Sequence, residues 1–529
     1  MNISQFIENG QAVLGMEFGS TRIKAVLVDD NNNPIASGSH DWENRLENNI
    51  WTYSREDIIS GMQQCYASLI ADVKNKYNVK IENLKAIGFS AMMHGYIALD
   101  ENNNMLVPFR TWRNTITGEA STLLTDMFGF HIPQRWSIAH LAQAVLNGEE
   151  HVGRIKYLTT LAGYIQLLLT GRKILGVGEA SGMFPIDTAI CNYNEEMTGK
   201  FDDFLKGHNI GIKLADILPE VAVAGEDGGV LTKEGAILLD VSGTLKPGIR
   251  LCPPEGDAGT GMTATDSVEV RTGNVSAGTS VFAMVVLEKE LKKVHKELDI
   301  VTTPEGKNVA MVHCNNCTSD INAWINLFKE FAQAMGNPIT NEQIYPLMFR
   351  LALEGEKDCG GLMGYNYFSG EHITGFDEGR PLLVRKPDSD FSLANFMRTQ
   401  LYTALGALKM GLDILVKEEC VAIDRVTGHG GFFKTPQVGQ KILAAAMNTP
   451  VTTLETAGEG GAWGIALLAS YMVNKGNNEN LTEFLHRAVF KDNKGVTVYP
   501  DKDDVAGYDT FMENYKKAMA VEKAAVENI

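Results

Sequence analysis

Two short turns, far apart in the chain, combine a glycine with neighbouring hydroxyl side chains. Gly19–Thr21 separates two apolar runs, and Gly278–Ser280 does the same more than halfway along the chain. Each pattern predicts two strands joined by a tight turn. A glycine turn exposes backbone N–H groups, and adjacent hydroxyls add donors, so such a turn can bind a phosphate. One such turn is ordinary, but the pair predicts two similar lobes that bind one nucleotide.

The composition is that of a large globular protein and excludes several classes of function. A chain of 529 residues predicts two to four domains, and a net charge of −18 argues against nonspecific binding to nucleic acid or anionic membranes. The first residues lack the basic and apolar parts of a signal peptide, and no apolar run is long enough to span a bilayer. With an odd count of 7 cysteines, we expect a cytoplasmic protein without disulfides.

Strand and helix patterns alternate in the N-terminal part. The first hairpin is predicted over Gly15–Asp29, followed by a strand at Ile35–Ser39. Ser54–Asn78 begins with a capping box and carries one apolar stripe, which predicts a helix. Ala86–Ser90 reads as a buried strand. This order predicts an α/β fold with a mixed sheet covered by helices.

The C-terminal part repeats this order after its own hairpin around Gly278. Apolar spacing predicts a long helix over Leu393–Lys417, a strand over Val421–Thr427, and a helix over Gln437–Met447. A strand at Val451–Glu455 and a helix at 460–474 follow.

The repetition predicts one boundary, between Gly261 and Gly273. We therefore expect an N-terminal lobe over residues 1–265 and a C-terminal lobe over 266–529. The chain from about residue 479 is polar with scattered apolar residues, which predicts helices packed on the C-terminal lobe.

Asp257 is the first candidate for chemistry. It follows an apolar stretch and opens a glycine-rich, helix-like segment at the predicted boundary. As a structural residue it would cap that helix. As a functional residue it would be the general base of a phosphoryl transfer to an alcohol, a reaction that needs positioned donors, a metal ion and a carboxylate to accept the hydroxyl proton.

Polar and aromatic residues after predicted strands are further candidates. His94 lies at the end of a strand, where ligands of open sheets bind, and an imidazole there can bind a sugar hydroxyl or be purely structural. Trp112–Asn114, after a strand-like Met105–Phe109, offers an aromatic face with polar neighbours for a sugar, unless the tryptophan belongs to the core.

Three further segments carry weaker signals. Gly428–Lys434 lies between a strand and a helix, where glycines let the backbone approach a flat ligand and a helix N-terminus favours anions. Ala457–Ala462 is a second loop of this kind. Cys314–Cys317 has the spacing of a metal or redox pair, but no second pair accompanies it, which favours ordinary buried thiols.

Taken in order over about residues 12–472, these motifs resemble the FGGY carbohydrate kinases of the actin–hexokinase–chaperone ATPase superfamily, and among them the xylulokinases. The segments that carry the resemblance are Met93–Gly95 with Leu99–Asp100, Trp112, Gly256–Ala258, Gly278–Ser280, Phe368–Glu371 and Gly428–Gly431.

The resemblance implies two ribonuclease H-like lobes with a central cleft. It also implies ATP-dependent phosphorylation of a ketopentose hydroxyl with Mg²⁺, with D-xylulose converted to D-xylulose 5-phosphate as the first choice. L-ribulose and other ketoses or polyols remain open, as does a non-catalytic sugar- or nucleotide-binding regulator on the same fold. Neither nucleic acid nor membrane is an expected partner, and a homodimer is in keeping with the family.

The resemblance also implies roles for individual residues. Asp257 is the general base in this reading. The remaining assignments are Met93, His94, Trp112 and Asn114 for the sugar; Gly19, Ser20, Thr21, Lys24, Gly278, Thr279 and Ser280 for the phosphates of ATP; Gly430, Gly431 and Phe432 for adenosine; and Glu17, through water, and Asp257 for the metal.

Three departures from the family pattern accompany the resemblance. Glu17 stands where the family usually has Asp, which leaves the metal contacts open. Phe432–Thr435 makes the adenosine loop longer and bulkier than usual, which leaves the nucleotide placement open. After Trp112 the chain has Arg113–Asn114 in place of the Asn-Asp of xylulokinases, so the sugar remains undecided.

Overall fold

The computed structural model describes residues 2–455, 460–492 and 495–529. The chain divides into two compact units. Unit 1 comprises Met1–Val268, Asp299–Val309 and Glu459–Asn493, and unit 2 comprises Glu269–Leu298, Ala310–Gly458 and Lys494–Ile529. The chain leaves unit 1 after Val268 and returns to it twice. The single boundary predicted near residue 265 therefore describes only the first passage of the chain from unit 1 to unit 2.

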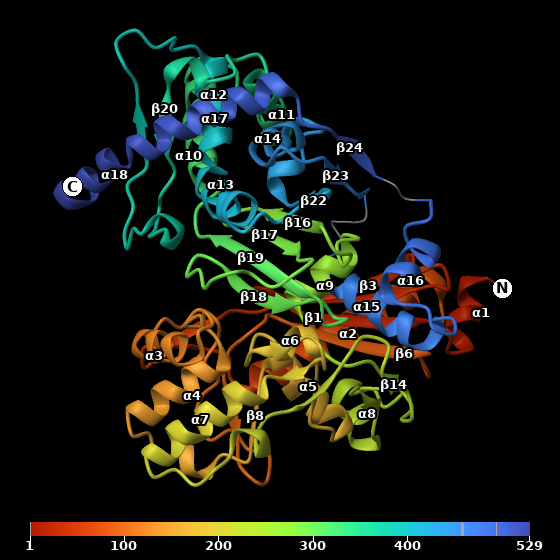
Figure 1. Cartoon of the computed structure of the whole chain (residues 1–529). Coiled ribbons are helices and arrows are strands. Elements are labelled where there is room, and N and C mark those ends of the chain that lie inside the picture. Colours follow the sequence, from red (N-terminus) through yellow and green to blue (C-terminus); the bar gives the residue numbers. More distant parts are fainter. Residues whose placement is uncertain (1, 456–459, 493–494) are drawn as a thin grey trace. The chain divides into compact units, whose positions relative to one another are not determined.

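The sheet of unit 1 is built around the first predicted hairpin, and Figure 1 shows its strands β1, β2, β3 and β6 in red and orange and β14 in yellow-green. Its strand order is β13-β14-β6-β1-β2-β3, and β15 also pairs with β6. Strand β1 is antiparallel to β2 and parallel to β6, which confirms the predicted hairpin and buried strand. The strands are β1 (Val13–Phe18), β2 (Arg22–Val28), β3 (Pro34–Asp41), β6 (Ala86–Ala91), β13 (Gly229–Val230), β14 (Arg250–Leu251) and β15 (Glu255–Gly256).

Two helices cover opposite faces of this sheet. Successive residues of a strand point to opposite faces, and glycines on each face admit one helix. A Cβ atom on Gly15 would lie 2.1 Å from the carbonyl oxygen of Ala462 in α15 (Gly460–Asn474). A Cβ atom on Gly38 would lie 2.4 Å from the backbone nitrogen of Leu69 in α2 (Arg55–Tyr77). Both helices agree with the sequence prediction, and α2 has the predicted capping box at Ser54.

The remaining elements of unit 1 surround this sheet and form small hairpins and a helical region. They are α1 (Ile3–Glu8), β4 (Arg45–Glu47), β5 (Ile50–Thr52), β7 (Ile97–Leu99), α3 (Gly118–Phe128), α4 (Ser137–Leu146), η1 (Val152–Arg154), β8 (Tyr157–Thr159), α5 (Leu161–Thr170), β9 (Ile174–Gly176), α6 (Val177–Ala180), β10 (Ile186–Asp187), β11 (Asn192–Tyr193), α7 (Glu195–Gly207), η2 (Leu214–Asp216), β12 (Glu220–Ala222), α8 (Lys233–Leu239), α9 (Asp257–Ala264), β18 (Asp299–Thr302) and α16 (Leu481–Ala488).

The sheet of unit 2 repeats the arrangement of unit 1. Strand β16 is antiparallel to β17 and parallel to β22, as β1 is to β2 and β6. Within unit 2 the strand order is β19-β17-β16-β22-β23-β24. The strands are β16 (Thr272–Ala277), β17 (Val281–Val286), β19 (Asn308–Cys314), β22 (Arg425–His429), β23 (Val451–Thr453) and β24 (Val496–Val498).

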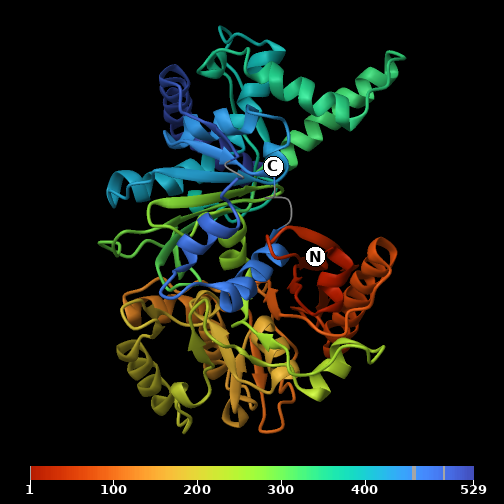
Figure 2. The ribbon, with the colours of Figure 1, turned by 90° about the vertical axis from the view of Figure 1, so that its right-hand side faces the viewer.

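Helices of unit 2 pack around this sheet. Figure 2 shows α10 and α11, in green, side by side, and both also contact α12. The elements are α10 (Ser319–Ala334), α11 (Asn341–Ala352), η3 (Cys359–Gly361), β20 (Met363–Tyr365), η4 (His372–Thr374), β21 (Leu382–Val384), α12 (Leu393–Thr403), α13 (Gly406–Asp413), η5 (Ile414–Glu418), η6 (Gly431–Phe433), α14 (Val438–Met447), α17 (Lys502–Lys517) and α18 (Met519–Asn528).

Several sequence predictions are wrong in detail. The long helix predicted over Leu393–Lys417 is interrupted after α12, and it ends as the π-helix η5. The strand predicted from Val421 begins only at Arg425, because the ladder with β16 starts there. In the strand-like segment Met105–Phe109 only Met105 forms an isolated bridge, with Leu99, so the segment is not a strand.

The end of the chain is also divided between the units. Helix α16 belongs to unit 1, whereas α17 and α18 belong to unit 2, so the segment from residue 479 does not pack as a whole on the C-terminal lobe. Residues 457–459 of the predicted loop at Ala457–Ala462 lie outside the described residues. Within the described residues, no helix is both long and apolar enough to cross a membrane.

Candidate active site

Asp257 is the first residue of α9, directly after β15. The N-cap position of the helix is Gly256, so the interpretation of Asp257 as the N-cap residue is wrong. Instead its Oδ1 accepts a hydrogen bond of 3.1 Å from the backbone N–H of Met93. Asp257 stays accessible to solvent, but the protein around its carboxyl group raises its pKa above the ordinary 3.8, and the Met93 N–H and the charge of Arg135 partly offset this.

The loop after β6 brings Met93 and His94 beside Asp257. His94 adopts a left-handed conformation, with φ of 72°, and its Nδ1 lies 3.1 Å from the carbonyl oxygen of Gly182. Because a carbonyl only accepts hydrogen bonds, Nδ1 carries the proton there. The ring stacks on Trp136, with the ring centroids 6.2 Å apart. The two residues predicted to contact the sugar are therefore held at the carboxylate predicted to act as the base.

Two buried glutamates, which the sequence analysis missed, lie next to Asp257. Oxygens of Glu255 accept hydrogen bonds from the backbone N–H groups of Gly178 (3.3 Å) and Glu179 (2.9 Å). A Cβ atom on Gly256 would lie 2.3 Å from Oε2 of Glu179, so the carboxyl group of Glu179 closely approaches the backbone just before Asp257. Burial raises the pKa of Glu255 to about 8 and that of Glu179 well above its ordinary value.

These shifts bear on how much negative charge lies around Asp257. Glu255, with a pKa of about 8, is mostly protonated at pH 7, and the pKa of Glu179 is raised further by its neighbours Glu255 and Asp257. A protonated Glu255 adds no negative charge to this region. The raised pKa values of both glutamates therefore lessen the negative charge next to Asp257.

Glu17, at the end of β1, lies over the N-terminus of α15. A Cβ atom on Gly461 would lie only 2.1 Å from its Oε1, and the backbone N–H of Ala462 hydrogen-bonds to its carboxyl group. Lys24 is its partner across the β1–β2 ladder. Burial and the charge of Asp257 raise the pKa of Glu17 to about 7, against the opposing effects of Lys24 and Ala462.

The carboxylates of Glu17 and Asp257 fit a magnesium ion. They interact closely enough for Asp257 to raise the pKa of Glu17, and a divalent cation would relieve that repulsion. Mg²⁺ is commonly held by one or two carboxylates, substrate phosphates and water. Among the described residues, no group of three or more His, Cys, Asp or Glu side chains is arranged to hold a metal.

Aromatic side chains fix the first predicted phosphate turn. The indole N–H of Trp42 donates to the carbonyl oxygen of Gly19 at 2.7 Å, and the hydroxyl of Tyr53 donates to that of Ser20 at 2.5 Å. Trp112 is 36% exposed, and its indole N–H donates to Oγ of Ser20 at 3.1 Å. Trp112 is thus joined to the turn itself and retains an accessible aromatic face.

Asn114 does not share this exposure. It is buried, and its amide bonds both backbone groups of Trp51 at 2.9 Å and the carbonyl oxygen of Thr111 at 2.9 Å. Because these bonds hold the loop together, we leave Asn114 out of the sugar contacts proposed below. The guanidinium of Arg113 lies over the ring of Trp51, 4.2 Å from its centroid.

A second group missed by the sequence analysis is centred on Asp299 of β18. The Arg135 guanidinium forms an ion pair with Asp299, and Nε2 of His131 lies 3.5 Å from the same carboxylate. Burial opposes ionisation of Asp299, but Arg135 and His131 outweigh it and hold its pKa well below its usual value. The carbonyl oxygen of Arg135 also accepts the N–H of Gly95. A fixed positive charge therefore lies close to the His94 loop and Asp257.

In unit 2, the second predicted phosphate turn is hydrogen-bonded to the segment before α10. The N–H of Cys317 donates to the carbonyl oxygen of Thr279 at 2.9 Å, and that of Thr318 donates to Gly278 at 3.0 Å. Thr279 is exposed. Cys314 and Cys317 are buried free thiols, and burial raises the pKa of both, which agrees with the structural interpretation of this pair.

The predicted adenosine loop combines open and buried positions. Gly430 has φ of 99°, and a Cβ atom there would lie 2.4 Å from the carbonyl oxygen of Ala277. A Cβ atom on Gly431 would meet nothing within 4 Å, so this glycine lies in open space. Phe432 is fully buried and contacts Phe349, with the ring centroids 6.1 Å apart, so its side chain belongs to the core.

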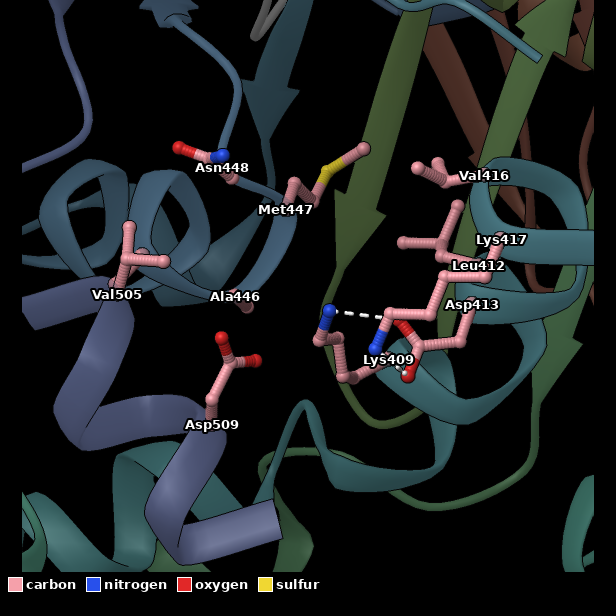
Figure 3. Close-up of a pocket in the computed structure, with 11 residues that line it drawn as sticks. Lys409, Leu412, Asp413, Val416, Lys417, Ala446, Met447, Asn448, Val505 and Asp509 are labelled. Atoms are coloured by element: carbon pink, nitrogen blue, oxygen red, sulfur yellow. Dashed lines mark hydrogen bonds and ion pairs between the residues drawn. The ribbon is translucent and has the colours of Figure 1, made fainter. Parts of the chain in front are cut away.

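A cavity of about 160 Å³ lies at the other end of α14 from this loop (Figure 3). None of the predicted site residues lines it. In its wall, the carboxylate of Asp413 forms ion pairs with Nζ of Lys409 at 2.7 Å, of Lys417 at 3.0 Å and of Lys516 at 3.3 Å. Burial opposes ionisation of Asp413, but these lysines outweigh it and lower its pKa. The cluster fastens α13 and η5 to α17.

We expect Asp413→Asn to lower the free energy of unfolding by about 1–3 kcal/mol at pH 7, because it leaves the nearly buried ammonium of Lys409 without its carboxylate. Since the pKa of Asp413 is lowered in the folded protein, the difference should be present above the ordinary 3.8 and disappear as the pH falls through the lowered pKa. Urea titrations at several pH values measure it. Asp424→Asn, which removes an exposed partner of Arg271, should cost less than about 1 kcal/mol.

Known proteins resemble this chain over most of its length. The xylulose kinase of Haemophilus influenzae is 22% identical over 474 residues, covering 86% of this chain and 88% of that protein. The xylulose kinase of Lactococcus lactis is 22% identical over 526 residues, covering 96% of both. A crystal structure of a ligand-bound xylulose kinase from Lactobacillus acidophilus has a TM-score of 0.77 at 16% identity, covering 97% of this chain and 98% of that one.

The family domains match in the order that the motifs predicted. Residues 12–244 match the N-terminal domain and residues 273–473 the C-terminal domain of the FGGY family of carbohydrate kinases. The structural likeness confirms the predicted α/β fold of the actin–hexokinase type. The chain therefore belongs to the FGGY family and is a carbohydrate kinase.

Proposed function

We propose that this kinase transfers the terminal phosphoryl group of ATP to a hydroxyl of a ketopentose, with D-xylulose as the first candidate and Asp257 as general base. The hydrogen bond from Met93 to Asp257 carries the proposal, because it joins the predicted sugar loop directly to the predicted base. The two curated relatives are named xylulose kinases, which supports D-xylulose as the substrate.

In the proposed mechanism, Asp257 accepts the proton of the attacking hydroxyl as the new O–P bond forms. The amide of Met93 keeps one carboxylate oxygen in place, and the raised pKa of Asp257 makes it a better proton acceptor than an ordinary aspartate. Mg²⁺, held by Glu17 and Asp257 together with phosphate oxygens, would neutralise charge on the phosphates. His94, Met93 and Trp112 would orient the sugar.

The phosphate and adenosine contacts follow the two turns and the glycine loop. Ser20, Thr21 and Lys24 of unit 1 supply hydroxyl donors and a positive charge. The turn Gly278–Ser280 supplies further donors from unit 2, and Gly430 with Gly431 offers backbone that a flat base can approach. We assign Phe432 to the support of this loop rather than to contact with adenosine, because it is fully buried.

A coupled ADP-release assay over ketopentoses, ketohexoses and polyols tests the proposal. We expect the highest kcat/KM with D-xylulose. If Arg113–Asn114, which replaces the Asn-Asp of xylulokinases, changes the contacts with the sugar, the highest kcat/KM should be with L-ribulose. A folded protein supplied with Mg·ATP that releases no sugar-dependent ADP with any member of the panel would contradict the proposal. Tight sugar binding without turnover would instead support the alternative of a non-catalytic regulator.

A further inference from the structure

Asn316 joins the segment Cys314–Thr318 to the loop Phe368–Glu371 by hydrogen bonds. Oδ1 of Asn316 accepts the backbone N–H groups of Phe368 (2.9 Å) and Ser369 (3.1 Å). Its Nδ2 donates to the carbonyl oxygen of Ser369 at 3.2 Å. The two segments are more than 50 residues apart in the chain, so these bonds fix one against the other within unit 2.

Glu371 is the buried acceptor at the centre of this contact. Its exposed fraction is 0%, and its Oε2 accepts the N–H of Asn315 (2.9 Å), the N–H of Asn316 (3.3 Å) and Nδ2 of Asn316 (3.2 Å). Burial raises its pKa to about 7, against the effect of these donors. A buried carboxyl group that takes three donors from one short segment fixes the path of that segment.

The same short segment continues into the second phosphate turn. Directly after Asn316, the N–H of Cys317 donates to the carbonyl oxygen of Thr279, and the N–H of Thr318 donates to that of Gly278. The hydroxyl of Thr318 donates to the Gly278 oxygen as well, at 2.7 Å. Residues 315–318 therefore connect Glu371 to the turn. The N–H groups of the first two residues donate to Glu371, and those of the last two donate to the turn.

Because a trans peptide is planar, these bonds also fix the direction in which the N–H groups of the turn point. In such a peptide the carbonyl oxygen and the following N–H point to opposite sides. Because the Gly278 and Thr279 oxygens point to Thr318 and Cys317, the N–H groups of Thr279 and Ser280 point away from that segment. Two successive N–H groups directed to one side form an anion-binding feature.

We propose that Glu371 is a positioning residue for nucleotide phosphate: through Asn315–Thr318 it fixes the direction of the Thr279 and Ser280 N–H donors. This inference rests on the proposed use of ATP. Glu371 itself is buried and does not touch the phosphate; it acts by keeping the turn in one conformation before the nucleotide binds, which lowers the cost of ordering it.

Two variants of Glu371 separate positioning from charge. Glu371→Ala removes the acceptor of three donors and should raise the KM for ATP about 10-fold, while the KM for the sugar stays within about twofold. Glu371→Gln keeps a carbonyl oxygen for the same donors and should restore the KM for ATP to near that of the native protein. Steady-state kinetics and calorimetric titration with the non-hydrolysable analogue AMP-PNP measure both variants.

Glu522→Ala is the matched control. Glu522 is also a fully buried carboxyl group of unit 2, and it accepts the N–H of Arg380 at 2.7 Å. Its loss should lower the melting temperature without changing the affinity for AMP-PNP. If Glu371→Ala does not fold, Thr318→Val, which removes only the hydroxyl donated to Gly278, should still weaken AMP-PNP binding.

The outcomes separate this inference from the proposed function. An affinity of Glu371→Ala for AMP-PNP equal to that of Glu522→Ala, or a Thr318→Val variant with native affinity where Glu371→Ala fails to fold, would overturn the positioning role. A native protein that binds AMP-PNP but phosphorylates no sugar would contradict the proposed function, while weaker binding by Glu371→Ala would still support the inference. A native protein that does not bind AMP-PNP would overturn both.

Discussion

Asp257→Asn should lower kcat about 10²–10⁴-fold and leave the fold intact. An amide cannot accept the hydroxyl proton, and general-base catalysis contributes an effect of about this size. The amide oxygen can still accept the N–H of Met93, so the loop that carries His94 should stay in place. Steady-state kinetics with Mg·ATP and the preferred sugar measure the change.

Sugar binding and thermal stability are the controls for Asp257→Asn. Calorimetric titration should give a sugar affinity within a few-fold of the native protein, and the melting temperature should be unchanged or higher, because a partly desolvated charge has been removed. If the variant kept most of its kcat, Asp257 would be a structural residue of the loop rather than the base.

Glu17→Gln should have opposite effects on stability and activity. Burial and the charge of Asp257 both disfavour the carboxylate of Glu17, so its neutral isostere should raise the free energy of unfolding by about 1 kcal/mol in metal-free buffer. A neutral amide is a poorer partner for Mg²⁺ and its bound water, so the Mg²⁺ concentration for half-maximal rate should rise about 10–100-fold. Urea titration and a magnesium titration of the rate measure the two effects.

Glu101→Gln, an exposed substitution in the same unit, is the matched control and should change neither quantity. A Glu17→Gln variant with the native magnesium dependence would show that Glu17 serves only as the acceptor at the N-terminus of α15. A less stable variant would show that its bond with Ala462 outweighs the repulsion from Asp257.

Elements whose determinants lie close together in the chain could be predicted well. Helix α2 was found with its first turn, because Ser54, Asp57 and the apolar stripe are all local signals. The break between α12 and α13 was missed because apolar spacing continues through it. The helix that follows the break packs closely on other parts of unit 2: a Cβ atom on Gly406 would lie 3.0 Å from the ring of Tyr515, and one on Gly411 would lie 2.3 Å from Val312.

The same distinction applies to the site. Met93, His94 and Asp257 follow strands, and their positions could be inferred from strand ends. The positions of Glu179 and Asp299 could not be inferred in this way. Each comes from a different part of the chain, and only the packing of the folded protein brings it near the loop. Nor does the sequence show that the amide of Asn114 is used within its own loop.

The most direct test of the central claim is the identity of the phosphorylated product. Phosphorus NMR of a reaction with Mg·ATP and D-xylulose, with L-ribulose in parallel, follows ADP, inorganic phosphate and sugar phosphate together. We predict one equivalent of a sugar phosphate monoester for each ADP with the native protein, and almost none over the same time with Asp257→Asn. ADP formed with inorganic phosphate and no ester, or equal ester formation by Asp257→Asn, would contradict it.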